Sequence, residues 1–215
     1  AVGMLVVIIA GGMDMTVGRL AGLGAVVSGT LAQQSTYYIK FWPSLPEMPL
    51  IVPIVVSIII GIISGVITGL IISKLKVPAF LAGLGLQLII YGGNLLFMKK
   101  APNNSQPLAG FKESFTKFGT GSVAGVNYLI IVAFVVMIAV YIILNMTTLG
   151  KNIYATGGNR EAAKVAGINV FKIDMFVYIL SGALAALAGC MLAARTGSAN
   201  ATYAEGYEMD AIASC

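Results

Sequence analysis

Long apolar runs without charge are the feature that most restricts the folds open to this chain. Residues 49–73 contain no Asp, Glu, Lys or Arg, and comparable runs occupy residues 77–97, 125–144 and 173–193. An α-helix of about 20 such residues crosses the ~30 Å hydrocarbon layer of a bilayer. Alternation of apolar and polar residues with period two, which a membrane β-barrel requires, is absent from the sequence. The sequence therefore predicts an integral membrane protein built from helices.

The predicted fold is all-α, a polytopic transmembrane helical bundle with five full spans and a partial one. The fifth span, residues 14–32, is the weakest because Asp14 and Arg19 lie near its start, and residues 1–13 form half a span. Hydrophobic residues make up 58% of the chain and charged residues 10%, against about 25% charged in soluble proteins. Because the chain begins inside one apolar run and stops as another begins, we expect an internal fragment of a longer protein.

Several classes of chemistry are excluded by what the sequence lacks. There is no His, which removes His-ligated zinc and His-based catalytic triads, and Cys190 and Cys215 make no disulfide framework. The net charge of +5 is spread over loops, so no nucleic-acid interface is expected. The pair Gly150-Lys151 lacks the upstream glycine of a phosphate-binding loop. We therefore predict no catalytic site, no metal site and no cofactor within this chain.

Small residues recur at helix-packing spacing in the first long run. Gly61, Gly65 and Gly69 lie four residues apart and so share one face of the predicted helix. Such a ridge lets another helix approach closely in lipid. We interpret it as a packing surface rather than a ligand site.

The segment GGMDMTVGR, residues 11–19, combines a weakened helix with two charges. Glycines weaken the helix, and charged side chains at membrane depth are costly unless they face a bundle interior or a watery cavity. Broken helices at this depth are frequent in transport pathways. The alternative is a short turn at the membrane surface between two helices. The residues predicted to border a translocation pathway are Gly12, Asp14, Gly18 and Arg19.

Residues 145–172 form the connection with the strongest signals of local structure. Asn159 is a favourable helix N-cap, Glu161 lies in the first turn where the helix dipole favours an anion, and Gly167 suits the C′ position. These signals predict a helix over residues 160–166, which is too short to be stable alone in water. It either docks in a partner's groove or is an inert capped turn. Docking would turn one small apolar face inward, made of Ala162, Ala163, Val165 and Ala166.

The distribution of Lys and Arg orients the loops only weakly. Two loops that share one side, 74–76 and 145–172, hold six of these residues, and the three loops on the other side also hold six. Per residue the first pair is denser, which favours the cytoplasmic side for residues 145–172.

Three segments together resemble one family of membrane proteins. EAAKVAG, residues 161–167, matches the E-A-A-x-x-x-G signature of permease subunits of bacterial ATP-binding-cassette importers. GGMDMTVGR resembles the G-G-x-D-L-S-x-G segment of the monosaccharide permeases of the ribose and galactose type. Residues 150–170 and 194–214 resemble further segments of that subfamily. The likeness covers the whole chain and is greatest to galactose and methyl-galactoside permeases.

The resemblance implies that residues 1–215 form one incomplete transmembrane permease domain, with residues 145–172 as its cytoplasmic coupling loop. It implies a non-enzymatic importer subunit for a galactose-, methyl-galactoside- or ribose-like sugar in the bacterial cytoplasmic (inner) membrane. The implied partners are a second permease copy, an extracytoplasmic sugar-binding protein and cytoplasmic ATPase subunits, which would hold ATP and Mg²⁺. No cluster of polar residues that would grip sugar hydroxyls is evident within the predicted spans. The residues implied to couple to the ATPase are Asn159, Arg160, Glu161, Ala162, Ala163, Lys164 and Gly167.

Two other functions fit parts of the sequence. An ion-gradient-driven secondary transporter would use Asp14 as its coupling-ion or proton site. An intramembrane enzyme would use the acids Glu205, Glu208 and Asp210, but these are expected in a polar tail beyond the last span.

Overall fold

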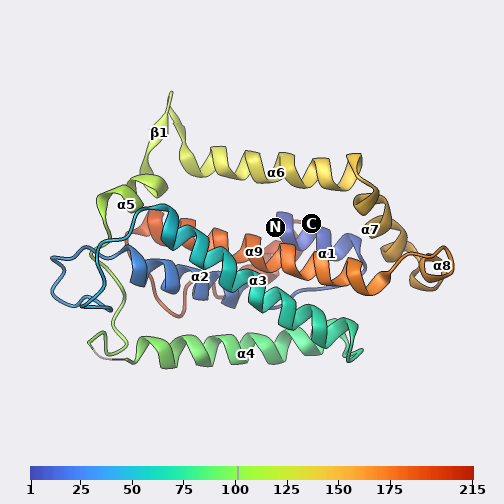
Figure 1. The fold of residues 1–215 in the computed structure, drawn as a ribbon, viewed down its shortest axis with the longest axis horizontal. Coiled ribbons are helices and arrows are strands. Elements are labelled where there is room, and N and C mark those ends of the chain that lie inside the picture. Colours follow the sequence, from blue (N-terminus) through green and yellow to red (C-terminus); the bar gives the residue numbers. More distant parts are fainter. Residues whose placement is uncertain (101) are drawn as a thin grey trace.

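A computed structural model describes residues 1–100 and 102–215. Within them the chain forms ten helices and one two-stranded hairpin (Figure 1). The elements are α1 (Val2–Ile9), α2 (Val17–Ala32), α3 (Ile51–Ser73), α4 (Ala79–Met98), α5 (Glu113–Thr120), β1 (Ser122–Val123), β2 (Val126–Asn127), α6 (Tyr128–Met146), α7 (Thr148–Gly158), α8 (Arg160–Val165), α9 (Val170–Thr196) and α10 (Tyr207–Ala213).

Among the described residues, four helices are long and apolar enough to cross a membrane. They are α3, α4, α6 and α9, with 23, 20, 19 and 27 residues, and they confirm four of the predicted spans. The fifth, α2, begins at Val17 rather than at residue 14 and has 16 residues. At 1.5 Å per residue it covers about 24 Å, less than a full span. The all-α polytopic bundle is confirmed, with α1 and α2 as its shorter apolar helices.

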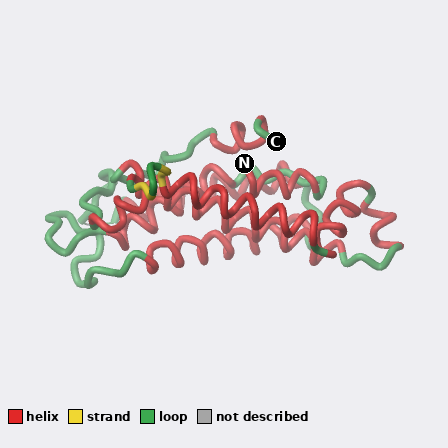
Figure 2. Tube along the Cα trace, turned by 90° about the horizontal axis from the view of Figure 1, so that it is seen from above, coloured by secondary structure: helices red, strands yellow, loops and turns green. Residues whose placement is uncertain are grey.

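Helix α9 lies at the centre of the bundle. It packs against α1, α2, α3 and α5, while α6 and α4 lie on opposite sides of this group (Figures 1 and 2). The predicted glycine ridge of α3 faces α9. A Cβ at Gly65 would stand 2.5 Å from the carbonyl oxygen of Tyr178, and Gly61 and Gly69 meet Gly182 and Met175 of α9. The interpretation of this ridge as a packing surface is therefore confirmed.

The connections gather at the two ends of the bundle. The turn between α3 and α4 lies at the same end as α7 and α8, and the loop after α2, α5 and the hairpin lie at the other (Figure 1). The hairpin pairs Ser122 with Asn127 and Val123 with Val126. Helices α5 and α7 were not expected within the loops.

The segment after α9 folds back into the bundle. Gly197 ends α9 with φ +67°, and Ala199 pairs with Leu108 in the loop before α5. The chain then returns along α2, where a Cβ at Gly22 would stand 2.6 Å from the carbonyl oxygen of Tyr203. It ends in α10, which contacts α1 and α2. The predicted tail does follow the last span, and Glu205 and Asp210 are exposed, but Glu208 and several alanines of this segment are buried against the bundle.

Candidate functional site

The helix break predicted around Asp14 is present in the bundle interior. Helix α1 ends at Ile9, Gly11 adopts φ +77°, and α2 begins only at Val17. Asp14 is 2% exposed. Its Oδ1 accepts hydrogen bonds from the Thr16 amide (3.0 Å) and hydroxyl (2.6 Å), and its Oδ2 accepts one from the Ser181 hydroxyl (2.7 Å). Asp14 therefore joins the start of α2 to the middle of α9 within the protein interior.

The two predicted glycines of this segment are sites of close approach. A Cβ at Gly12 would stand 2.6 Å from the Tyr178 hydroxyl, and a Cβ at Gly18 would stand 2.7 Å from the carbonyl oxygen of Ala204. Any larger residue at Gly18 would also overlap the Glu208 carboxylate. These glycines let α9 and the returning segment lie against the helix break.

Arg19 forms the second charged contact of the segment. Its guanidinium is 2.7 Å from Oε1 of Glu205 and lies 4.1 Å over the ring of Tyr91 on α4. The Arg19 side chain is 10% exposed, whereas that of Glu205 is 60% exposed. The structure thus brings together α2, α4 and the returning segment around one cation, at the depth where α2 begins.

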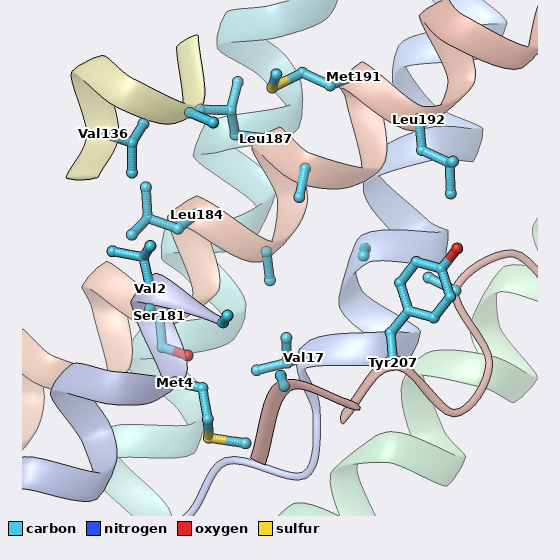
Figure 3. A pocket seen from close by; sticks show the side chains of 18 of the residues that line it. Val2, Met4, Val17, Val136, Ser181, Leu184, Leu187, Met191, Leu192 and Tyr207 are labelled. Carbon is cyan, nitrogen blue, oxygen red and sulfur yellow. The ribbon is translucent and has the colours of Figure 1, made fainter. Parts of the chain in front are cut away.

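A pocket of about 590 Å³ lies between α1, α6, α9 and α10, and its lining is mainly apolar (Figure 3). Val17 and Ser181 line it, but none of the four predicted pathway residues does. Val17 and Arg19 are two residues apart and therefore point to opposite sides of the helix. An apolar lining offers few partners to a hydroxylated substrate.

Sequence reasoning missed the polar residues of α4. Gln87, Tyr91 and Asn94 are separated by four and three residues, so they share one face of the helix. Asn94 is 1% exposed. Their helical spacing could have indicated a polar face on α4. It was overlooked because each of these residues stands alone within an apolar run.

The loop helix forms close to the predicted boundaries. The Asn159 side chain accepts hydrogen bonds from the amides of Glu161 and Ala162, both at 3.0 Å. Helix α8 ends at Val165, and Gly167 follows with φ +83°. The Gly167 amide donates to the Lys164 carbonyl at 3.0 Å, which closes the helix in the way glycine C-caps do. Both predicted caps are confirmed.

The predicted apolar face of α8 is partly buried within the chain and partly exposed. Ala163 is 3% exposed and packs within this chain, where α8 contacts α7 and α9, whereas Val165 is 90% exposed. The prediction that Ala163 faces a partner is therefore wrong. The residues left open to a partner are Ala162, Val165 and Ala166.

Charged contacts fix α8 to the rest of the chain. Arg160 pairs with the buried carboxylate of Asp174 near the start of α9. Lys164 lies 2.6 Å from Glu161, and this hydrogen bond, with the charges of Lys164 and of Lys76 in the α3–α4 turn, lowers the pKa of Glu161. Within residues 1–100 and 102–215, no three Cys, Asp or Glu side chains gather as metal ligands would.

Comparisons with known proteins match the whole chain. The family model described as "Branched-chain amino acid transport system / permease component" matches residues 1–215. The galactose/methyl galactoside import permease protein MglC of Escherichia coli (strain K12) is 39% identical over 219 residues, which cover 100% of this chain and 65% of that protein. MglC of Haemophilus influenzae is 37% identical, with the same shares covered.

The ribose import permease protein RbsC of Escherichia coli (strain K12) is 36% identical over 99% of this chain and 62% of its own length. The chain thus spans less than two thirds of the length of these curated relatives. No solved structure matches it. The match over every residue, together with the four apolar spans, shows that this multi-pass membrane protein belongs to the family of branched-chain amino acid transport system permease components.

Proposed function

We propose that this chain is the membrane-spanning part of an ATP-driven importer that carries a monosaccharide across the bacterial cytoplasmic membrane. Its relatives named for galactose, methyl galactoside and ribose import support this substrate class. The proposed assembly contains a second permease copy, cytoplasmic ATPase subunits and an extracytoplasmic binding protein. ATP and Mg²⁺ belong to the ATPase subunits in this proposal.

The observation that carries the proposal is the way α8 is held. It has only six residues, yet it is capped at both ends and anchored by Ala163 and by the Arg160–Asp174 pair. It nevertheless exposes Val165 at 90% outside the spans. An anchored helix with an exposed apolar side chain fits the groove of a partner protein. Its ion pair to α9 would transmit a movement of α8 to the bundle.

The coupling role therefore needs the exposed face rather than the buried one. On this proposal the ATPase contacts Ala162, Val165 and Ala166, while Asn159 and Gly167 keep α8 in shape. Residues 145–172 and the α3–α4 turn would lie in the cytoplasm. The excess of Lys and Arg per residue in these two segments supports that orientation.

The test is sugar-stimulated ATP hydrolysis by the full-length permease assembled with its ATPase and binding protein. We expect Val165→Glu to reduce this activity by at least tenfold, because it places a charge in an apolar contact. Val123→Glu is the matched control, since Val123 is also exposed (52%) but lies at the opposite end of the molecule. Wild-type activity in Val165→Glu would remove α8 from the coupling mechanism.

Gly167→Val tests the cap separately from the contact. Its φ of +83° strains a β-branched residue by roughly 1–2 kcal/mol. A Cβ there would meet nothing within 4 Å, so the strain is conformational alone. We expect weakened association of the ATPase, measured by co-purification, while the permease itself still folds.

A further inference from the structure

Buried polar atoms without a hydrogen-bond partner are concentrated in one part of the bundle. Among the residues that the structure describes, they are Nη1 of Arg19, Oε1 of Gln87, both amide atoms of Asn94 and Oε2 of Glu208. Arg19 belongs to α2, Gln87 and Asn94 to α4, and Glu208 to α10. Most buried polar side-chain atoms in proteins are paired, and unpaired ones are especially costly at membrane depth. We therefore expect a polar molecule to supply the missing hydrogen bonds of these atoms.

The face of α4 that carries these atoms is turned toward α2. Gly83, Gln87, Tyr91 and Asn94 follow one another at helical spacing along this face. A Cβ at Gly83 would stand 2.9 Å from Cβ of Met15, and the Tyr91 ring lies 4.1 Å from the Arg19 guanidinium. We call this surface the α2–α4 seam, formed by Arg19, Gln87, Tyr91 and Asn94.

Glu208 lies beside the seam on the returning segment. Its carboxylate approaches Gly18, the residue before Arg19, and the Glu208 residue is 7% exposed. Glu205, which pairs with Arg19, is 60% exposed. Glu205, Arg19 and Glu208 therefore place three ionisable groups beside the start of α2, and such groups in a membrane protein normally face the bundle interior or a watery cavity.

The unpaired atoms include both donors and acceptors. Arg19 Nη1 and the Asn94 amide nitrogen donate, while Gln87 Oε1, Asn94 Oδ1 and Glu208 Oε2 accept. A hydroxyl group does both, so a molecule with several hydroxyls can satisfy this set. A zwitterionic amino acid would bring a carboxylate that only accepts and an ammonium that only donates, each with a full charge, although the charge of Arg19 is already offset by Glu205. A neutral polyol matches both kinds of atom without adding a charge.

We propose that the α2–α4 seam, with Glu208 at its edge, is the contact site for a monosaccharide as it crosses the membrane. This rests on the proposed function and adds the residues that recognise the sugar within the permease. The seam replaces some of the water that hydrates the sugar hydroxyls, and it binds weakly because the sugar must leave again. Asp14 is not part of the seam, because its carboxylate oxygens have hydrogen-bond partners within the chain.

The experiment measures uptake of radiolabelled D-galactose and D-ribose by the complete transporter in vesicles. Asn94→Leu and Gln87→Met remove the amide atoms and keep most of the side-chain volume. We expect each to lower kcat/KM for sugar uptake by roughly three- to tenfold, the effect of one lost hydrogen bond. Leu88→Met is the matched control, because Leu88 lies on the exposed face of the same helix (68%).

Thermal unfolding of the same variants separates binding from a structural role. Removing an unpaired amide without changing shape leaves stability equal or higher, so we expect no loss of Tm. Wild-type uptake in both variants would overturn the proposal, since the seam would then hold only water. A fall in Tm together with uptake would also overturn it, because the amides would be structural. If the proposed function itself is wrong, the result is different: the wild-type transporter takes up leucine and no sugar.

Discussion

Asp14 and Arg19 show how two charges five residues apart acquire different surroundings. The carboxylate of Asp14 is enclosed and accepts three hydrogen bonds from Thr16 and Ser181. The guanidinium of Arg19 pairs with Glu205 but keeps one buried nitrogen without a partner. Asp14 is thus suited to hold the helix break in place, whereas Arg19 keeps one donor for the sugar contact that we propose.

We expect Asp14→Leu to destabilise the fold rather than to change transport alone. The variant leaves the Thr16 amide, the Thr16 hydroxyl and the Ser181 hydroxyl without their acceptor, at about 1–3 kcal/mol for each unsatisfied group. Asp14→Asn keeps one acceptor oxygen and should cost less. Thermal unfolding in detergent measures both, with Asp210→Asn as the control, since Asp210 is exposed. Equal Tm values for Asp14→Leu and the wild type would contradict this role.

Glu47 gives the loop after α2 a specific dependence on pH. The Ser35 amide (3.0 Å) and hydroxyl (2.8 Å) donate to its carboxylate, and Lys112 lies 3.3 Å away. The Ser35 amide, then its hydroxyl and then Lys112 lower the pKa of Glu47 from 4.5 to about 2. Because the folded pKa is depressed, this contact stabilises the loop above pH 4.5 and is lost as the pH falls toward 2.

Fluorescence of Trp42 measures that loss directly. Trp42 is the only tryptophan of the chain; it lies in the same loop and packs on Phe41 and on Phe97 of α4. We expect its emission to change between pH 4.5 and pH 2 in the wild type. In Glu47→Gln this step should be absent. An unchanged step in the variant would assign the titration to another group.

The sequence predicts elements well where apolar residues form them. Helices α3, α4, α6 and α9 follow from hydropathy alone, and α8 follows from its caps at Asn159 and Gly167. Helix α7 was missed because TLGKNIYATGG contains three glycines and has little intrinsic helix preference. Its helix depends on packing, since Gly150 lies against the Leu144 carbonyl and Gly157 against the Ile9 carbonyl. Contacts of this kind cannot be inferred from local pattern.

The returning segment was missed for a related reason. Three acids within residues 205–210 are typical of a solvated tail, but Glu208 is buried beside Gly18. Ala204 with φ +60° and Gly206 with φ +84° form the turn before α10. What places Glu208 in the interior is the small size of Gly18 and Gly22, far away in the sequence. The candidate site therefore depends on long-range packing that the sequence pattern does not encode.

The glycine ridge of α3 gives a prediction at the same scale. A Cβ at Gly65 would stand 2.5 Å from the Tyr178 carbonyl oxygen and 2.7 Å from Cα of Ile179, both backbone atoms. We expect Gly65→Ala to destabilise the bundle by about 1–3 kcal/mol through overpacking. Gly85→Ala is the control, because nothing lies within 4 Å of that position. A lower Tm for Gly85→Ala than for Gly65→Ala would contradict the packing of α3 on α9.

For the whole molecule, the two sets of loops at opposite ends define the topology to be tested. Ser105 is exposed at the end that holds α5, and Val165 is exposed at the end that holds α8. We expect a membrane-impermeant thiol reagent to label Ser105→Cys in intact cells and to spare Val165→Cys, in a background without other cysteines. The reverse labelling pattern would invert the proposed orientation.

The energy source of transport distinguishes the ATP-driven importer from the ion-gradient transporter. The named relatives are sugar import permeases, which supports the importer and not the ion-gradient transporter. The exposed face of α8 offers a contact for a separate ATPase subunit in the importer that we propose.

The most direct test is uptake of labelled D-galactose into proteoliposomes that contain the full-length permease, its ATPase and its binding protein. Our account predicts uptake that requires ATP on the side of α8 and continues when an uncoupler collapses ion gradients. Uptake that proceeds without ATP and stops with the uncoupler would contradict it.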